Sequence, residues 1–364
     1  MTKTTLEQIR QKVMDRKATL SDEVVSVKSL MMDPAQPGKI IIRRPGSAKE
    51  DVYSFDPLVY KQTSAVVYGL PGSYLEKLVE GEKGDPGLAA LNFNHWVGVS
   101  KDKEVLVRFQ QRGDERAIRA LLSATWNPIP YERSIETLIS KFGPDKPVKL
   151  TKFDNNGLVI DIVSRRLDDE TAGIDRERHA RVLRSDPIEW GFRFQDSDAG
   201  NMGDLKIAPY TLRLVCTNGA TSMSKGVVIG VSHTGKDSQV IDGVMSNLRQ
   251  GVEMIDGYSA RIIDQIEASQ GINLRVNDET GEPDSALVRL ARDMAVTRLE
   301  DKYIREGWRV EGESIKANNL YRLANAVTRA GTHAEELTDE SRLKLQAVGG
   351  SILETAVYPS HMWN

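Results

Sequence analysis

The chain has 364 residues, of which 40% are hydrophobic and 28% are charged, as in an ordinary globular protein that can bury a sizeable core. The formal net charge of −3 excludes a uniformly basic coat for nucleic acid, although a local basic groove remains compatible with it. No apolar run approaches the roughly 18 residues of a membrane helix, and Cys216 is the only cysteine. We therefore expect no membrane association, no intrachain disulfide and a cytoplasmic location.

The first two thirds of the sequence predict a body that is rich in β-strands. Leu6, Ile9 and Val13 recur at helical spacing and predict a helix over residues 5–17. Asp56-Pro57 is a typical helix start, because Asp caps free N–H groups and Pro fits the first turn. Further helices are predicted at 73–79, 114–122 and 132–141. Strands are predicted at 24–27, 39–43, 52–55, 105–109, 148–153, 158–163, 188–194, 210–216 and 227–231.

No strand is predicted after Asp237, so the fold class is α+β. We expect a mixed or antiparallel sheet body over residues 1–235 and a helical region over 236–364. One long helix should follow Lys236, since Leu248, Ile255 and Ile262 lie on a narrow apolar stripe with near-heptad spacing. The helix either packs along the sheet or pairs with another subunit, and the second interpretation predicts a homo-oligomer.

One stretch carries a recognisable pattern. A predicted strand ends at Val215-Cys216-Thr217-Asn218-Gly219, where Asn-Gly is a tight-turn signal, and a second strand runs into His233-Thr234-Gly235. The pattern resembles an uncharacterised protein family found in bacteriophages, prophages and plasmids. Asn325-Ala326-Val327-Thr328 and the segments 119–130 and 342–350 are similar to further parts of that family. Trp126, Thr217 and Ala220 depart from its commoner Tyr, Ser and Leu. The resemblance implies a mobile-element protein and no particular activity.

The segment Gly230-Val231-Ser232-His233-Thr234-Gly235-Lys236 matches the first seven positions of a phosphate-binding loop. The eighth position is Asp237, which would repel phosphate and cannot supply the hydroxyl that binds magnesium. We therefore expect a structural turn, with a nucleotide-binding enzyme as an alternative.

Other catalytic or metal-binding arrangements find little support. The histidines are widely separated, and the calcium-like run from Asp196 to Asp204 has Ile207 where a ligating Glu is needed. That run is therefore expected to be a flexible acidic loop. Cys216 and His233 could be imagined as nucleophile and base, but Cys216 ends an apolar strand, where a buried inert thiol is favoured. We predict no metal, no cofactor and no enzymatic activity.

Clustered arginines and an aromatic strand suggest a nucleic-acid interface. Arginine forks suit phosphate oxygens, and bases of any sequence stack on aromatic rings such as the alternating Trp190, Phe192 and Phe194. The alternatives are that neighbouring acids neutralise the arginines after residue 165 and that the rings belong to the core. The candidate nucleic-acid-binding residues are Arg108, Arg112, Arg116, Arg119, Arg176, Arg178, Arg181, Arg184, Trp190 and Arg213.

Together these features predict a non-enzymatic bacteriophage or mobile-element protein that binds nucleic acid. Its most concrete form is a single-stranded DNA binding or annealing protein acting in DNA recombination or replication. Basic side chains in a groove would neutralise the phosphate charges of one strand, and the base edges would stay free to pair. The alternatives are a structural or interaction protein, such as a virion component or a modulator of host defence, and the P-loop-like nucleotide-binding enzyme.

Overall fold

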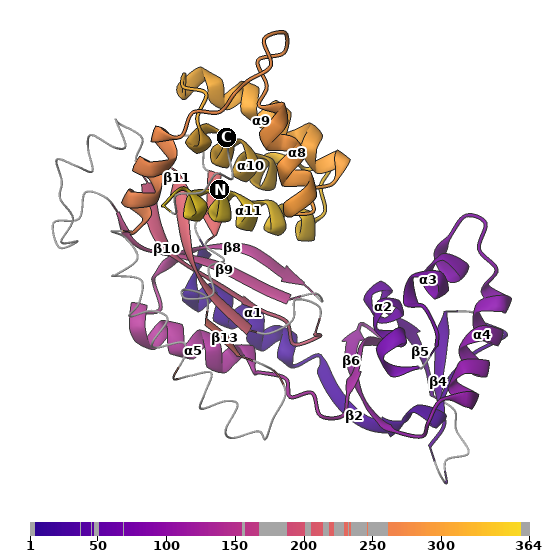
Figure 1. Cartoon of the computed structure of the whole chain (residues 1–364). Helices are drawn as coiled ribbons and strands as arrows, with labels where there is room; N and C mark the ends of the chain where they lie inside the picture. The colour runs from indigo at the N-terminus through magenta and orange to yellow at the C-terminus, as the bar shows by residue number, and fades with distance from the viewer. Residues whose placement is uncertain are drawn as a thin grey trace. The chain divides into compact units, whose positions relative to one another are not determined.

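A computed structural model shows the arrangement of the chain (Figure 1). It describes residues 4–36, 38–44, 46, 51–67, 69–154, 157–166, 188–200, 205–213, 218–221, 229–231, 233, 246 and 261–357. Helices and two sheets make up the described chain, and only helices occur as regular elements over residues 261–357. The predicted α+β class is confirmed.

The chain forms two compact units that are interleaved along the sequence. The first consists of Met1–Val159, Gln195–Leu205 and Val231–Met245, and the second of Ile160–Phe194, Lys206–Gly230 and Ser246–Asn364. The sequence analysis instead placed a single boundary after residue 235.

A six-stranded mixed sheet belongs to the first unit. Its strands lie in the order β2 (Leu20–Ser26), β6 (Glu104–Arg112), β7 (Glu115–Ser123), β5 (Asp51–Phe55), β4 (Lys39–Ile42) and β3 (Leu30–Met32), with the 3-10 turn η1 (Val27–Ser29) between β2 and β3 in the sequence. The β5–β7 pair is parallel and the other pairs are antiparallel. The strands predicted at 24–27, 39–43, 52–55 and 105–109 are therefore confirmed.

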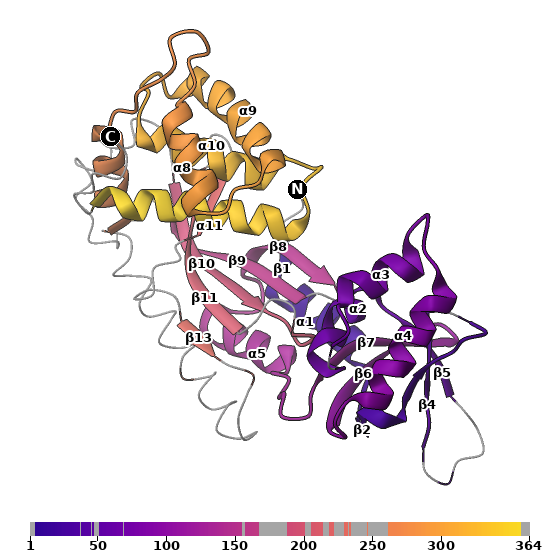
Figure 2. The same cartoon turned by 45° about the vertical axis from the view of Figure 1, so that its right-hand side comes forward.

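Three helices pack against one face of this sheet: α2 (Pro57–Val66), α3 (Gly72–Glu80) and α4 (Pro86–Val99), as Figure 2 shows. Ile40, Phe93 and Val107 are among the buried residues of the shared core. The Asp56 side chain accepts a hydrogen bond from Leu58 N at the start of α2, as predicted. The sequence analysis missed α4, although Asp85-Pro86 repeats the same start signal.

The second sheet has seven strands. Their order is β1 (Thr4–Thr5), β8 (Pro147–Asp154), β9 (Gly157–Arg166), β10 (Ile188–Asp196), β11 (Leu205–Arg213) and β12 (Asn218–Thr221), and β13 (Ile229–Val231) also pairs with β11.

In the first unit, α1 (Leu6–Lys17) contacts α5 (Tyr131–Phe142), which confirms both predicted helices. The turn predicted at Asn218-Gly219 is wrong, because both residues belong to β12 and pair with Arg213 and Leu212. Cys216 lies outside the described residues.

Helices of the second unit form a bundle: α8 (Asp284–Asp293), α9 (Arg298–Ser314), α10 (Leu320–His333) and α11 (Asp339–Val357). Helix α10 contacts both α9 and α11 and is buried over most of its length. Asn325, Ala326, Val327 and Thr328 are all buried there, so this phage-like segment is part of the packing of the bundle. Residues 261–271 are also helical, and they include the end of the predicted long helix. Most of residues 237–260 lies outside the described residues.

Candidate nucleic-acid interface

The first arginine cluster lies on a β-hairpin and not at a strand-to-helix junction. Residues 115–123 form strand β7, so the helix predicted at 114–122 is wrong. Arg112 pairs with Glu115 across a two-residue loop of Gly113 and Asp114, and Gly113 has a φ of 62°. Hairpin loops of this length need a residue that tolerates positive φ, which explains why the chain reverses at this glycine.

A β-bulge interrupts the pairing of the hairpin at two of these arginines. Arg108 pairs with Ala120 and Phe109 with Ile118, which leaves Arg119 as the extra residue. Arg119 donates to both carboxylate oxygens of Asp198, one of them at 2.9 Å, and Arg108 donates to Asp198 O. Arg108 is 6% exposed and Arg119 is fully buried. The structure therefore gives these two predicted phosphate ligands a partner inside the protein and leaves little or none of their surface to solvent.

Asp198 is the centre of this buried network. Burial alone would raise its pKa, but the hydrogen bonds and charge of Arg119, with smaller contributions from Arg108 and Arg16, lower the pKa to about 2. The Tyr131 hydroxyl donates to Asp198 Oδ1 at 3.1 Å and accepts from Asp198 N at 2.9 Å. The described part of the expected flexible acidic loop, residues 196–200, is thus largely buried and held by charged hydrogen bonds, which corrects that prediction.

The depressed pKa of Asp198 predicts a loss of stability in acid. An unfolded Asp takes up its proton near pH 4, whereas folded Asp198 does so near pH 2. Its contribution is therefore present above about pH 4 and should be lost as the pH falls to 2, at a cost of about 2 kcal/mol. Urea unfolding of the wild type and of Asp198→Asn between pH 5 and pH 2 checks this. The wild type should lose about 2 kcal/mol more than the variant, and parallel profiles would contradict the assignment.

His233, from the phosphate-loop-like segment, is buried beside this network. Its Nε2 lies 3.0 Å from Asp196 Oδ1, and its Nδ1 lies 3.1 Å from Asn127 O. The imidazole ring stacks on Trp126 at 4.3 Å between centroids, with an interplanar angle of 11°. Burial raises the pKa of Asp196, and the neighbouring imidazole opposes that rise. Both ring nitrogens thus face oxygen atoms within the first unit, which indicates a structural role for His233.

Arg112 and Arg116 are the arginines of this cluster that reach solvent. The Arg112 side chain is 43% exposed, and its Nη2 donates to Asp56 Oδ2 at 2.5 Å. The Arg116 guanidinium lies over the Phe109 ring, 3.9 Å from its centroid, and Nη2 donates to Ser21 Oγ at 2.7 Å. Arg116 is half-buried, and its hydrogen bond to Ser21 holds the guanidinium beside the edge strand β2.

The remaining predicted site residues are described only in part. Arg176, Arg178, Arg181 and Arg184 lie outside the described residues. Trp190 lies on β10 and Arg213 on β11, but the structure does not describe their side chains. Phe192 and Phe194 are fully buried, so these two rings of the aromatic strand belong to the core.

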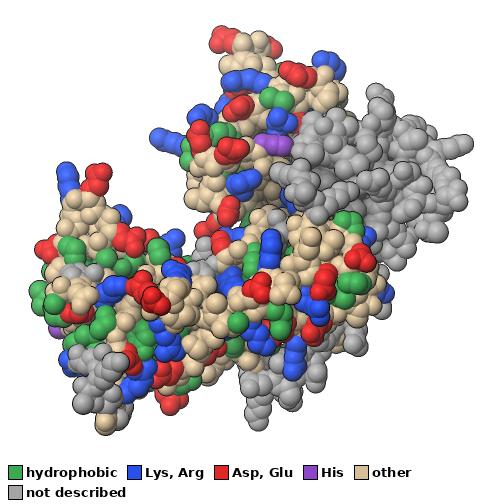
Figure 3. Space-filling view, turned by 180° about the vertical axis from the view of Figure 1, so that it is seen from behind, with side chains coloured by type: hydrophobic (Ala, Val, Ile, Leu, Met, Phe, Trp, Pro, Cys, Tyr) green, Lys and Arg blue, Asp and Glu red, His purple; other side chains and the backbone are tan. Residues whose placement is uncertain are grey.

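The residues that hold the buried network together were not predicted from the sequence. Asp198, Tyr131 and Asp196 were not predicted as partners of Arg119 or His233, and no local pattern identifies them. Figure 3 shows basic and acidic side chains interspersed over the described surface on the face that it displays. On that face an anionic partner would therefore meet small basic areas and not a continuous basic field.

Among the residues that the structure describes, no group of three or more His, Cys, Asp or Glu side chains could hold a metal ion. Within the same part of the chain, every helix is too short or too polar to cross a membrane.

Comparison with family models, with curated proteins and with solved structures found no match. The site is therefore interpreted from its own residues.

Proposed function

We propose that the protein is a non-enzymatic, single-strand DNA binding or annealing protein of a phage or mobile element. The observation that carries the proposal is the position of the Arg116 guanidinium. Its central carbon lies 3.9 Å from the centroid of the Phe109 ring, and the residue is half-buried near the start of β7. A guanidinium held in this way offers its other face to a base and its N–H groups to a phosphate.

Arg112 lies at the tip of the same hairpin and offers a second basic side chain to an anionic strand. Its side chain is 43% exposed, but its pairing with Asp56 offsets part of its charge. Arg116 donates to the neutral Ser21 hydroxyl and should therefore contribute more to anion binding. The phage-like motifs imply a mobile element and no particular activity, so the recombination or replication role is itself part of the proposal.

Removing both arginines should weaken binding to single strands without a change in sequence preference. For Arg112→Ala with Arg116→Ala we expect an affinity loss of about tenfold in low salt, which is about 1.4 kcal/mol. The log–log salt slope should fall by about 0.7 for each lost phosphate contact. Fluorescence anisotropy of a labelled oligonucleotide over a salt series measures both.

Arg10→Ala is the matched control, because Arg10 is 45% exposed and lies on α1, away from the hairpin. Its affinity and salt slope should stay close to those of the wild type. A wild-type protein that binds no oligonucleotide in low salt would remove the proposal.

A second candidate function, a structural or interaction protein, is favoured by the outer face of α4. Leu88, Leu91 and Val99 are 39%, 69% and 58% exposed, and they fall with the exposed His95 on one side of the helix. All 14 residues of α4 are uncharged. Such a face can meet the same face of a second copy without like-charge repulsion, so we propose that α4 forms a contact between two copies of this chain.

Leu91→Lys tests the α4 contact, because it places a charge in the middle of the apolar face. We expect the wild type to sediment as a dimer or larger assembly and the variant to sediment as a monomer. Val288→Lys is the control, since Val288 is also exposed, at 65%, but lies on α8. A wild type that stays monomeric at high concentration excludes the contact.

A further inference from the structure

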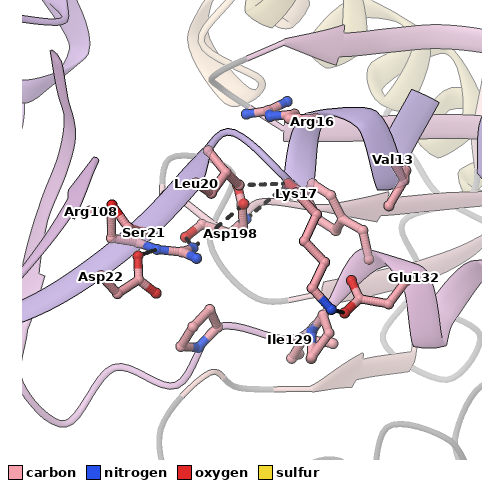
Figure 4. A pocket seen from close by; sticks show the side chains of 13 residues that line it. Val13, Arg16, Lys17, Leu20, Ser21, Asp22, Arg108, Ile129, Glu132 and Asp198 are labelled. Carbon is pink, nitrogen blue, oxygen red and sulfur yellow. Dashed lines mark hydrogen bonds and ion pairs between the residues drawn. The ribbon is translucent and has the colours of Figure 1, made fainter. Parts of the chain in front are cut away.

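A pocket in the first unit lies beside the Arg116 site. Its volume is about 330 Å³, and its lining comes from the end of α1, the start of β2, β6, the segment before α5 and Asp198. Figure 4 shows Lys17 with Glu132 on one side and Arg108 with Asp22 on the other. Ser21 belongs to the lining and also accepts the hydrogen bond from Arg116.

The charged groups of the pocket balance one another. Arg16, Lys17 and Arg108 face a lining that also holds Asp22, Glu132 and Asp198. A phosphate would approach three carboxylates, and an amine cation would approach three basic side chains, so neither has a clear advantage. A neutral ligand with both hydrogen-bond donors and acceptors fits this lining better, because each ion pair presents one group of each kind.

The ligand must be neutral with donors and acceptors, and the apolar part of the lining requires that it also have an apolar surface. Leu20, Pro128, Ile129 and Pro130 contribute carbon surface, and Ile129 is 1% exposed. A volume of about 330 Å³ is at the small end of the range for ligand pockets, roughly 300–1,000 Å³. A flat ring with apolar faces and a polar edge, with its attached sugar, meets both requirements.

We propose that this pocket holds one base of the bound single strand, and that the base carries both an exocyclic amine and a carbonyl group, as cytosine and guanine do. The inference rests on the proposed function. Asp22 or Glu132 would accept from the amine, and Lys17 would donate to the carbonyl oxygen. Thymine has carbonyl groups and an N3–H but no exocyclic amine, and adenine has the amine but only ring nitrogens as acceptors, so neither presents an amine and a carbonyl oxygen together. Ser21 lines the pocket and accepts from Arg116, so the nucleotide next to the bound base would meet this guanidinium.

Nucleosides and oligonucleotides test the pocket separately from the phosphate contacts. Calorimetric titration of the full chain should show that deoxycytidine and deoxyguanosine bind about tenfold more tightly than thymidine and deoxyadenosine. Oligo(dC) should bind more tightly than oligo(dT) of equal length. Asp22→Asn with Glu132→Gln should remove both preferences, whereas Arg112→Ala with Arg116→Ala should weaken both oligonucleotides and keep the preference.

Glu104→Gln is the matched control, because this exposed acid lies at the start of β6 outside the pocket lining, and the variant should keep the preference. Equal binding of all four nucleosides, or a preference that survives in the pocket variant, overturns the base assignment and leaves the proposed function standing. Failure of every oligonucleotide to bind contradicts the proposed function and the pocket assignment within it. Circular dichroism confirms that each variant is folded.

Discussion

Asp198→Asn should lower the free energy of unfolding by about 3–5 kcal/mol, because the variant keeps the size of the side chain and removes its charge. Asp198 receives two hydrogen bonds from the buried Arg119 guanidinium, and Arg108 is also close, with Nη1 3.5 Å from Asp198 Oδ2. Without the carboxylate, the buried Arg119 would lose its acidic partner, and Arg108 would depend on the partly exposed Asp22. An amide would also present N–H groups to donors. Urea unfolding at pH 7 measures the loss.

Asp22→Asn is the control for the Asp198 prediction. Asp22 is also an acidic partner of Arg108, at 2.9 Å from Nε, but its side chain is 35% exposed and water can replace it. Its loss should therefore cost far less, within the range of about 0–1 kcal/mol for a partly exposed ion pair. Equal losses in the two variants would show that Asp198 is not the centre of a desolvated network.

Local chemistry made part of the fold predictable. The helix starts at Asp56-Pro57 and at Leu6 follow from capping and apolar spacing within a few residues, and the structure has both helices. The helix predicted over residues 114–122 is wrong because the apolar residues of this segment fit a helix as well as a strand. Gly113 decided the outcome, because its positive φ allows the two-residue loop that turns the chain into a hairpin.

The site was less predictable than the fold because its partners are distant in the sequence. Arg119 and Asp198 are 79 residues apart, and Arg193 and Asp161 are 32 apart. No periodic pattern joins such residues, so exposed and buried arginines look alike in the sequence. The bulge at Arg119 adds to the difficulty, since two residues of β7, Arg119 and Ala120, oppose Arg108 and the regular alternation of the strand is interrupted there. The arginine cluster was recognised, but the division into buried Arg108 and Arg119 and accessible Arg112 and Arg116 required the structure.

Arg193→Ala in the second unit should cost about 3–5 kcal/mol, because it leaves the Asp161 carboxylate buried without its cation. Arg193 Nε donates to Asp161 Oδ1 at 2.6 Å and Nη2 to Oδ2 at 2.8 Å. Nη1 donates to Gln346 Oε1 at 2.6 Å, and the guanidinium lies over the Tyr210 ring. Arg193 is 3% exposed and Asp161 is 1% exposed, so water cannot easily replace these hydrogen bonds.

Arg292→Ala provides a matched comparison in the same unit. Arg292 Nε also donates to an aspartate, Asp293 Oδ1, at 2.6 Å, but the Arg292 side chain is 71% exposed. The two ion pairs share their geometry and differ in their access to water, so Arg292→Ala should leave the urea midpoint nearly unchanged. Because desolvation and not distance sets the cost of losing one partner, the two variants should differ clearly. Similar midpoints for both would mean that the Arg193 pair is hydrated in solution.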